Sequence, residues 1–576
     1  MSLTPSPPTE PIPAAAVQPA PLPAKLATER DRGRGHQAPM QIRRKTGRGR
    51  ALRWQSTVRW VLHLVVWTPI AYGAVGGVAG GWTPTGDNAV IAVRAWGVLT
   101  SHGTLVGQPT FISHVFDLGP LEYWLIAIPV HMDPRYGPLL GASLMCMLAA
   151  SLAVEAAWSA FGLWGASAAA AVVTADVAWM PVLSYQSIWN PHFGEFWFLA
   201  TIASGLAVLM GNARWFAALV IAASVATQSH LMFAVPSITL VVLAALLIAV
   251  EAHRRRTSWQ WLVAGAVVGL ACWAAPFTQQ LTSSTGNMAA LLRSQAGSAR
   301  TGLGYGLRAV GLALDPRTLR PGGGHDLTAA LIGRSSAGAG ILVIVCALLV
   351  AALALALRSR ALGVVAIVNL LLLLSLAAVY ADSPKGDVKV ATYYLVEPTF
   401  PVGVFALLTG ATAVVLAGQW ILVRARRAGR FGRATAAAAE RGPSRLQQRL
   451  LSGACGVVVL AAMTFALANL SPAYGNPVLA QRQTAVPVAC TAIERQLPPG
   501  PVRLQVAARN ASQEQLLTFG ITECLVPAGY SPELTPSLAA YLGPTFSARS
   551  GTPLVSVLVS RQRTAVVLHT ASHPPG

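Results

Sequence analysis

Charged side chains are scarce in this sequence. Asp, Glu, Lys and Arg make up 11% of the 576 residues, which is less than half of the roughly 25% that is usual in soluble domains. Hydrophobic residues make up 54%. A membrane-spanning helix needs about 20 mostly apolar residues, and many such runs lie between Val58 and Leu470. The composition excludes an ordinary soluble protein and predicts a polytopic α-helical membrane protein.

Acidic residues are only half as numerous as basic ones, with 21 Asp and Glu against 42 Lys and Arg. The excess gathers in two segments that border apolar runs: residues 1–56 hold ten basic and three acidic residues, and Arg424–Arg449 holds eight Arg and one Glu. Basic residues beside spanning helices are typical of cytoplasmic loops. Nucleic-acid recognition needs a basic folded face with base-reading side chains, so we predict no nucleic-acid partner.

The apolar runs predict about eleven transmembrane helices. They are residues 58–81, 138–160, 163–183, 194–211, 214–229, 231–250, 259–277, 337–357, 361–380, 398–422 and 450–470. With the N-terminus inside, every strongly basic loop is cytoplasmic and the C-terminus is outside. The outer face then collects residues 82–137, 184–193, 278–336, 381–397 and 471–576. We expect the function to lie on this face.

Three parts are expected along the chain. Residues 1–56 are predicted to be a disordered basic cytoplasmic tail, because they contain too few apolar side chains to fold. They are not expected to be a signal peptide, because the first apolar run of the chain, 58–81, comes too late. Residues 57–470 form the membrane domain. Residues 471–576 are predicted to be a small extracytoplasmic α/β domain with a strand at 502–508, a helix at 512–519 and a hairpin of 554–559 with 565–569.

Cysteine is rare, with six residues in the chain. Four of them lie in apolar runs, where a thiol behaves as a small hydrophobic group. Cys490 and Cys524 are the two in the C-terminal segment, and such a pair in an oxidising compartment predicts a disulfide. Two free thiols are the alternative.

Two kinds of motif are missing. No His-Glu-x-x-His sequence indicates a metal site, although a divalent metal held by Asp87, His114 and His230 stays open as an alternative. The glycines of residues 278–336 follow no strand-to-helix phosphate pattern, so no nucleotide fold and no certain cofactor is predicted. This segment is long enough to be a lid over a cavity, with disorder as the alternative.

The first outer loop carries the clearest acidic residue. Asp87 follows Gly86 a few residues beyond the first apolar run. An acid at this position is a candidate functional residue, and the alternative is a helix cap or turn residue. The run Gly119–Leu125 (GPLEYWL) suits an interfacial helix lying along the bilayer. The candidate substrate-binding residues of this loop are His114, Asp117, Glu122 and Tyr123.

Further candidates lie at the outer ends of later runs. The turn Trp189–Glu195 (WNPHFGE) combines aromatic, imidazole and carboxylate groups, which suit sugar stacking and hydroxyl recognition. An acid inside an apolar run is by default a functional hypothesis, with a bond to a neighbouring helix as the alternative. These candidates are Trp189, Asn190, His192, Glu195, His230 and the intramembrane acid Asp176.

An acid just after the first membrane helix, followed by an amphipathic loop with an aromatic run, resembles the GT-C membrane glycosyltransferases. The protein O-mannosyltransferases and the aminoarabinose transferases of the lipid A pathway are the relatives it resembles most. The resemblance rests on Asp87 and Gly119–Leu125 and covers residues 58–131. It implies polyprenyl-phosphate sugar donors, an active site on the non-cytoplasmic face, and Asp87 as catalytic base or acceptor-orienting group. Asn88 stands where those families often have a second acid, and Asp117–Pro120 replaces their His-Pro-Pro sequence.

A departing lipid phosphate needs cationic or hydrogen-bonding partners. Interfacial residues that extend their charged ends toward water are the alternative interpretation of each outer-face cation. The candidates are Arg94, Arg293, Arg300, Lys385 and Lys389.

The resemblance therefore implies a bacterial plasma-membrane glycosyltransferase of cell-envelope biogenesis, transferring a hexose or pentose from a polyprenyl phosphate. The acceptor is a cell-wall glycan, a lipoglycan, a lipid or a protein. A transporter or flippase of lipid-linked glycans is the alternative, and it would require internal repeats and buried coupling charges. We find no repeat, and Asp176 is the only strong acid identified within the membrane.

Overall fold

The computed structural model describes residues 44–100, 103–110, 115–179, 187–255, 259–296, 299–315, 335–385, 398–427, 477–549, 551–559 and 564–569. The chain divides into two units, Met1–Ser56 and Thr57–Gly576. The first unit is described only from Arg44, where helix α1 begins.

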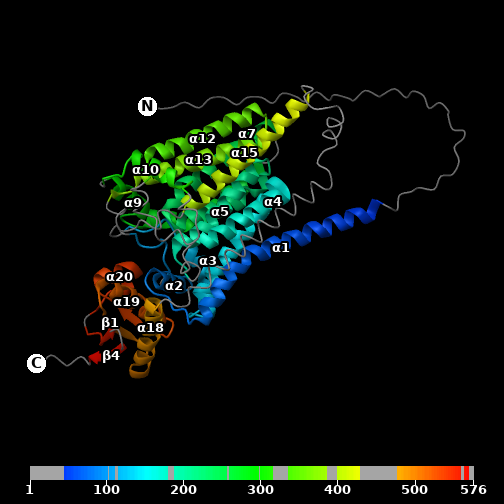
Figure 1. Ribbon diagram of the computed structural model, residues 1–576. Helices are drawn as coiled ribbons and strands as arrows, with labels where there is room; N and C mark the ends of the chain where they lie inside the picture. The colour runs from blue at the N-terminus through cyan, green and yellow to red at the C-terminus, as the bar shows by residue number, and fades with distance from the viewer. Residues whose placement is uncertain are drawn as a thin grey trace, which may run out of the picture. The chain divides into compact units, whose positions relative to one another are not determined.

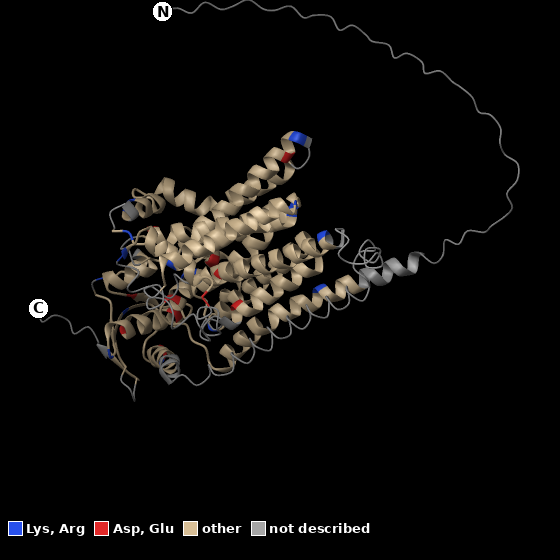
Figure 2. Ribbon diagram, turned by 45° about the horizontal axis from the view of Figure 1, so that its top comes forward, with Lys and Arg blue, Asp and Glu red and all other residues tan. Residues whose placement is uncertain are grey.

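Eight helices of the described chain are long and apolar enough to cross a membrane. Many of their large apolar side chains are exposed, for example Leu246, Val267 and Leu349, and Figure 2 shows the long helices largely free of charged residues. The protein is therefore a multi-pass membrane protein. The helices that hold these spans are α1 (Arg44–Ala79), α4 (Gly137–Trp179), α5 (Asn190–Leu209), α7 (Ala234–Arg255), α8 (Trp259–Thr282), α12 (Ala337–Ala356), α13 (Arg360–Asp382) and α15 (Thr399–Arg427).

The expected total of eleven spans differs from these eight for three reasons. Helix α6 (Phe216–Ser229) matches the expected run 214–229 but has only 14 residues. The expected span 450–470 lies outside the described residues. The run 138–160 and the described part of the run 163–183, up to Trp179, both belong to α4.

Helix α4 is interrupted at Gly162, whose φ of 66° and ψ of −149° are non-helical. A β-carbon at Gly165 would collide with the carbonyl of Ala157, eight residues earlier and about 12 Å away in a continuous helix. The chain therefore folds back at Gly162, where only glycine adopts this backbone conformation readily. The junction coincides with the expected gap between the second and third apolar runs.

An ion cluster joins α1 to α4 within the membrane domain. Arg59 pairs with Glu155, and Nε2 of His63 lies 3.0 Å from the same carboxylate. The guanidinium of Arg59 also lies over the ring of Trp158. The expectation that Asp176 was the only strong intramembrane acid is wrong, because Glu155 lies in the same helix α4.

Substitution Glu155→Ala is expected to lower the free energy of unfolding by about 1–2 kcal/mol, the scale of polar contacts between membrane helices. The reason is that Arg59 and His63 lose their shared acceptor. A thermal melt of the purified protein in lipid measures the loss, with Glu155→Gln as the milder variant that keeps an acceptor oxygen. An unchanged melting temperature in Glu155→Ala would contradict this role.

Short helices lie in segments between the spans (Figure 1). Helices α2 (Asp87–Gly97) and α3 (Leu121–Met132) lie between α1 and α4. The aromatic run predicted to be an interfacial helix begins α3, which exposes Ile128 and Met132 and buries Tyr123. The segment expected to be a lid or disordered contains α9 (Asn287–Ala296) and α10 (Leu303–Leu312), and α10 packs against α12 and α13.

The C-terminal segment folds into a two-layer α/β domain. Its sheet has the order β2-β1-β3-β4, with β1 (Pro501–Ala507) parallel to β2 (Ser531–Glu533) and β3 (Leu554–Val559). The expected hairpin is confirmed, because β3 pairs antiparallel with β4 (Thr564–His569). Helices α18 (Pro477–Gln496) and α19 (Ala511–Leu525) pack on the sheet, and the short helix α20 (Pro536–Leu542) follows β2. A disulfide between Cys490 and Cys524 joins α18 to α19.

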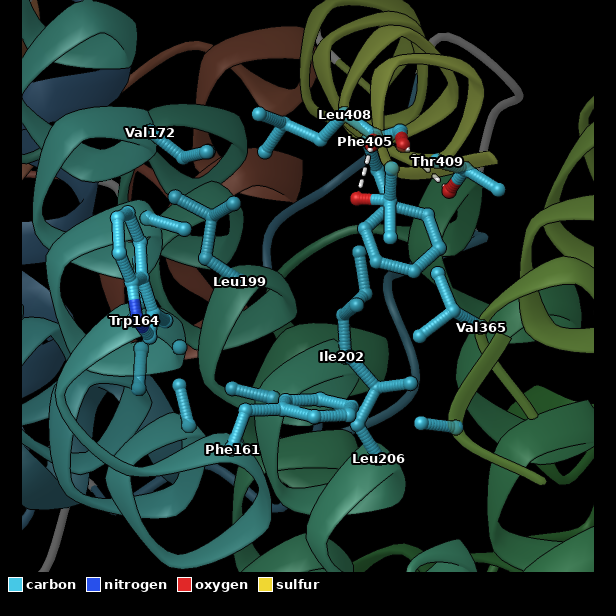
Figure 3. A pocket seen from close by; sticks show the side chains of 18 of the residues that line it. Phe161, Trp164, Val172, Leu199, Ile202, Leu206, Val365, Phe405, Leu408 and Thr409 are labelled. Carbon is cyan, nitrogen blue, oxygen red and sulfur yellow. Dashed lines mark hydrogen bonds between the residues drawn. The ribbon is translucent and has the colours of Figure 1, made fainter. Parts of the chain in front are cut away.

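An apolar cavity of about 420 Å³ lies among α4, α5, α13 and α15. Figure 3 shows Phe161, Trp164, Leu199, Ile202 and Phe405 around it, and nearly all of its lining is carbon. Leu199 lies nine residues after the start of α5, which is about 14 Å along the helix axis. The cavity therefore lies well within the membrane domain, away from the N-terminal end of α5.

Candidate active site

Asp87 is the first residue of α2, and its side chain points away from a capping position. The N-cap is Gly86, with a φ of 58°, and a β-carbon there would collide with the side chain of Leu516. The Asp87 carboxylate instead accepts a hydrogen bond from the indole N–H of Trp189 at 3.0 Å. The alternative of Asp87 as a helix cap is wrong, and its carboxylate is available for another role.

The Asp87 side chain is accessible at the surface, yet protein surrounds it closely. Removal of water by these surroundings raises the pKa of the Asp87 carboxyl, while the side chains of Trp189 and Gln108 favour the charged form and partly offset the rise. The positive end of the α2 dipole favours the carboxylate as well. An accessible carboxylate with a raised pKa is a stronger base than an ordinary aspartate.

A second carboxyl, that of Asp117, lies in the interior beside this site. It is 4% exposed and accepts from Nδ2 of Asn190 at 2.9 Å. Burial raises its pKa well above the ordinary value, and the nearby charge of Asp87 adds to the rise. The same Asn190 amide donates to the carbonyl of Ser229 at 2.7 Å. Asn190, the first residue of α5, therefore connects the segment of Asp117 with the C-terminal end of α6.

Glu122 and Tyr123 of α3 form the inner side of this acidic group. Glu122 is 3% exposed, and its Oε1 has no hydrogen-bond partner among the described residues. Burial, and then the charge of Asp117, raise the pKa of Glu122 well above its ordinary value. The Tyr123 hydroxyl donates to Oε1 of Gln108 at 3.1 Å. The Glu122 side chain is therefore buried away from solvent, whereas that of Asp87 is exposed.

Two segments far apart in the sequence meet at Asp87. The Ser187 hydroxyl donates to Oδ1 of Asn88 at 3.0 Å and accepts the backbone N–H of Trp189 at 3.1 Å. The Trp189 ring contacts the ring of His192 edge-on, with centroids 4.9 Å apart. An aromatic face beside a carboxylate suits a sugar, whose C–H face stacks on the ring while a hydroxyl meets the acid.

The remaining candidates take different places. His230 is the residue that ends α6. Its Nδ1 accepts the backbone N–H of Met232, two residues further on, at 3.3 Å. Glu195 in α5 and Asp176 in α4 are fully buried. His114 lies outside the described residues.

The candidate cations divide into two groups. Arg94 is 5% exposed, and its guanidinium donates to the carbonyls of Tyr541 and Gly107. Arg300 pairs with Asp382. Arg293 and Lys385 are exposed, and Lys389 lies outside the described residues.

Three neutral residues of the site were not identified from the sequence. Gln108 accepts the hydrogen bond from Tyr123, and Ser187 donates to Asn88. Asn287 at the start of α9 forms a two-way amide pair with the backbone of Phe116, at 3.0 and 2.9 Å, and fixes the segment that carries Asp117. Neutral loop residues carry no pattern in the sequence, because their roles depend on which loops meet.

The structure describes only two members of the possible metal set, Asp87 and His230, because His114 lies outside the described residues. No group of three or more His, Cys, Asp or Glu side chains in the part of the chain that the structure describes is placed to hold an ion. In particular, Nδ1 of His230 is used by the backbone of Met232.

The raised pKa of Asp87 predicts a pH dependence of activity. If the carboxylate is the base, kcat/KM rises with pH through this pKa, so the rising limb lies above the range of an ordinary aspartate. Substitution Trp189→Phe removes the indole donor that stabilises the carboxylate, and the limb is expected to move to higher pH. Rate profiles from pH 4 to 8 measure it, with the exposed Trp259→Phe as control. A limb that stays in place in Trp189→Phe would contradict this assignment.

Comparisons with known proteins identify the fold. No protein-family model and no curated protein sequence matches the chain. The crystal structure of ArnT from Cupriavidus metallidurans bound to undecaprenyl phosphate matches with a TM-score of 0.50 and 15% identity, over 90% of this chain and 98% of that one. The apo structure of the same protein matches with a TM-score of 0.48 and 15% identity, over 88% and 93%. A crystal structure of the Archaeoglobus fulgidus oligosaccharyltransferase matches with a TM-score of 0.37 and 12% identity, over 84% of this chain and 64% of that one. At this level of identity, the first match shows that the chain shares the fold of ArnT.

Proposed function

We propose that this protein is a GT-C-type membrane glycosyltransferase that moves a sugar from a polyprenyl-phosphate donor to an acceptor hydroxyl on the outer face. The observation that carries the proposal is Asp87: an accessible carboxylate of raised pKa, fixed at the start of α2 by the Trp189 indole. The fold shared with ArnT, whose structure contains undecaprenyl phosphate, supports a lipid-linked donor.

Asp87 is the general base in the proposed reaction. The acceptor hydroxyl oxygen forms a bond to the anomeric carbon of the sugar while the bond from that carbon to the phosphate oxygen breaks. The hydroxyl proton passes to the Asp87 carboxylate, and the lipid leaves as polyprenyl phosphate. A positioned base of this kind contributes about 10²–10⁴-fold to the rate.

The membrane domain provides apolar surroundings for the lipid chain. The cavity among α4, α5, α13 and α15 is lined by side chains such as Phe161, Leu199 and Phe405. It begins about 14 Å along α5 from the outer end of that helix, a depth that a polyprenyl chain exceeds. We place the distal part of the chain there.

The outer segments supply cations for the leaving phosphate. Residues 299–302 are hydrogen-bonded to residues 381–385 through their backbones. Lys385 is the last residue of this pairing, and its backbone N–H donates to the carbonyl of Ala299 at 2.8 Å. Arg300 lies in the same pair of segments. Arg293 lies on α9, whose first residue, Asn287, donates to the backbone carbonyl of Asp117. We propose Arg293, Arg300, Lys385 and Lys389 as phosphate partners.

The experiment that tests this function is transfer of radiolabelled sugar from a panel of synthetic polyprenyl-phosphate hexoses and pentoses. Purified protein in lipid vesicles is given membrane extract as the source of cell-wall glycan, lipoglycan, lipid and protein acceptors. Transfer from one donor is the expected result, and it identifies the sugar. No transfer from any donor, with or without divalent metal, would contradict the proposal and favour transport of lipid-linked glycans.

A further inference from the structure

Helix α2, which begins at Asp87, is packed into the C-terminal domain. Its apolar residues Ala89, Val90 and Val93 are buried in one hydrophobic cluster with residues of that domain, among them Val486 of α18 and Phe519 of α19. Helix α2 also contacts α19 and α20 directly. The helix that presents Asp87 therefore belongs to the hydrophobic core of a domain that follows it by almost 400 residues.

Both ends of α2 are tied to the same domain by hydrogen bonds. At its start, the backbone N–H of Gly86 donates to the carbonyl of Leu516 on α19 at 3.2 Å. At its other end, Nε and Nη2 of Arg94 donate to the carbonyl of Tyr541 at 3.1 and 2.7 Å. These bonds fix both the position and the axial rotation of α2 on the domain.

Arg94 connects this assembly to the rest of the site. Its Nη1 donates to the carbonyl of Gly107 at 2.7 Å, and its guanidinium lies over the rings of Phe116 and Tyr123. The backbone of Gly107 in turn donates to the carbonyl of Asp117 at 3.0 Å. One buried cation thus holds the C-terminal domain, α2 and the loop of Asp117 together.

We propose that the C-terminal domain holds Asp87 in its catalytic position and that Arg94 is the positioning residue of this contact, an inference that rests on the proposed function. Asp87 receives its partner Trp189 from the membrane domain and its location from α2 on the C-terminal domain. A displacement of about 1 Å at a catalytic group can reduce a rate by about 100-fold. The role replaces the expectation that Arg94 binds the donor phosphate.

The test is Arg94→Met in the full-length protein in lipid vesicles. Methionine retains much of the apolar stem of arginine but removes all donors to Tyr541 and Gly107. We expect kcat for transfer to fall by about 10–100-fold with KM for the lipid donor changed less than threefold. We also expect hydrogen exchange to become faster in residues 84–97, which include Gly86. Arg135→Met removes an exposed arginine between α3 and α4 and is expected to change neither.

A milder variant covers the case in which Arg94→Met fails to fold. Val90→Ala reduces the same interface without removing a charge, and smaller changes of the same kind in kcat and exchange are expected. Exchange in residues 84–97 and kcat both equal to wild type in Arg94→Met would overturn the proposal, as would a rise in KM alone, which would indicate phosphate binding. Failure of the proposed function has a different signature, because wild-type protein would then transfer no sugar, whatever the exchange measurement shows.

Discussion

Substitution Asp87→Asn is expected to lower kcat for sugar transfer by about 10²–10⁴-fold, the range that general-base catalysis contributes. The amide keeps the size of the carboxyl and still accepts the Trp189 indole N–H through its oxygen, but it cannot take the acceptor's proton. Donor affinity is expected to stay within threefold of wild type, because the proposed phosphate partners lie on other segments. Steady-state kinetics in lipid vesicles separate the two quantities.

Asp133→Asn is the matched control for this substitution. Asp133 is, like Asp87, an exposed aspartate between α1 and α4, but its carboxylate accepts the backbone N–H groups of Arg135 and Tyr136 at 2.9 and 3.1 Å. Asparagine fulfils that role as well as aspartate, so transfer is expected to be unchanged. Equal loss in Asp87→Asn and Asp133→Asn would mean that outer-face charge, and not a base at Asp87, determines the rate.

Asn190→Ala is expected to have the second-largest effect, on stability as well as activity. It leaves two buried acceptors, Oδ2 of Asp117 and the carbonyl of Ser229, without the amide that now serves both. Each loss of this kind costs about 1–3 kcal/mol, so the free energy of unfolding should fall by about 2–6 kcal/mol. The start of α5, next to Trp189, then loses its bonds to Asp117 and Ser229, and kcat is expected to fall at least tenfold.

Thermal melts and transfer rates of the same preparation measure both effects. Asn212→Ala is the control, because that amide makes one side-chain hydrogen bond, to Ser159, at the opposite end of α5 and α6. It should cost about 1 kcal/mol with unchanged kcat. A melting temperature in Asn190→Ala no lower than in Asn212→Ala would contradict the central place of Asn190.

The sequence indicates the residues of the site better than their arrangement. Asp87, Asp117, Trp189 and Asn190 could be named because they are polar or aromatic side chains in segments assigned to one face, and the structure brings them together. The gap between the runs 138–160 and 163–183 likewise marks the reversal at Gly162. Hydropathy and charge carry this information, because both follow from the cost of placing polar groups in lipid.

The rest depends on contacts that no local pattern contains. The role of Arg94 is set by the carbonyl of Tyr541, 447 residues further along the chain, and a backbone acceptor leaves no trace in the sequence. The role of Glu155 cannot be predicted from the sequence, because one acid hardly changes the mean hydropathy of the apolar run 138–160. Its partners, Arg59 and His63, lie on another helix, α1. Helices α9 and α10 could not be predicted, because the composition of their segment is rich in glycine.

The most direct test of the account follows the chemical fate of one doubly labelled donor, with the label in both the sugar and the lipid, in vesicles containing wild-type protein or Asp87→Asn. The account predicts that wild type forms one new glycosidic bond for each polyprenyl phosphate released, and that Asp87→Asn binds the same donor but releases neither product. Intact donor moved across the bilayer by both proteins, with no bond to the sugar broken, would contradict it.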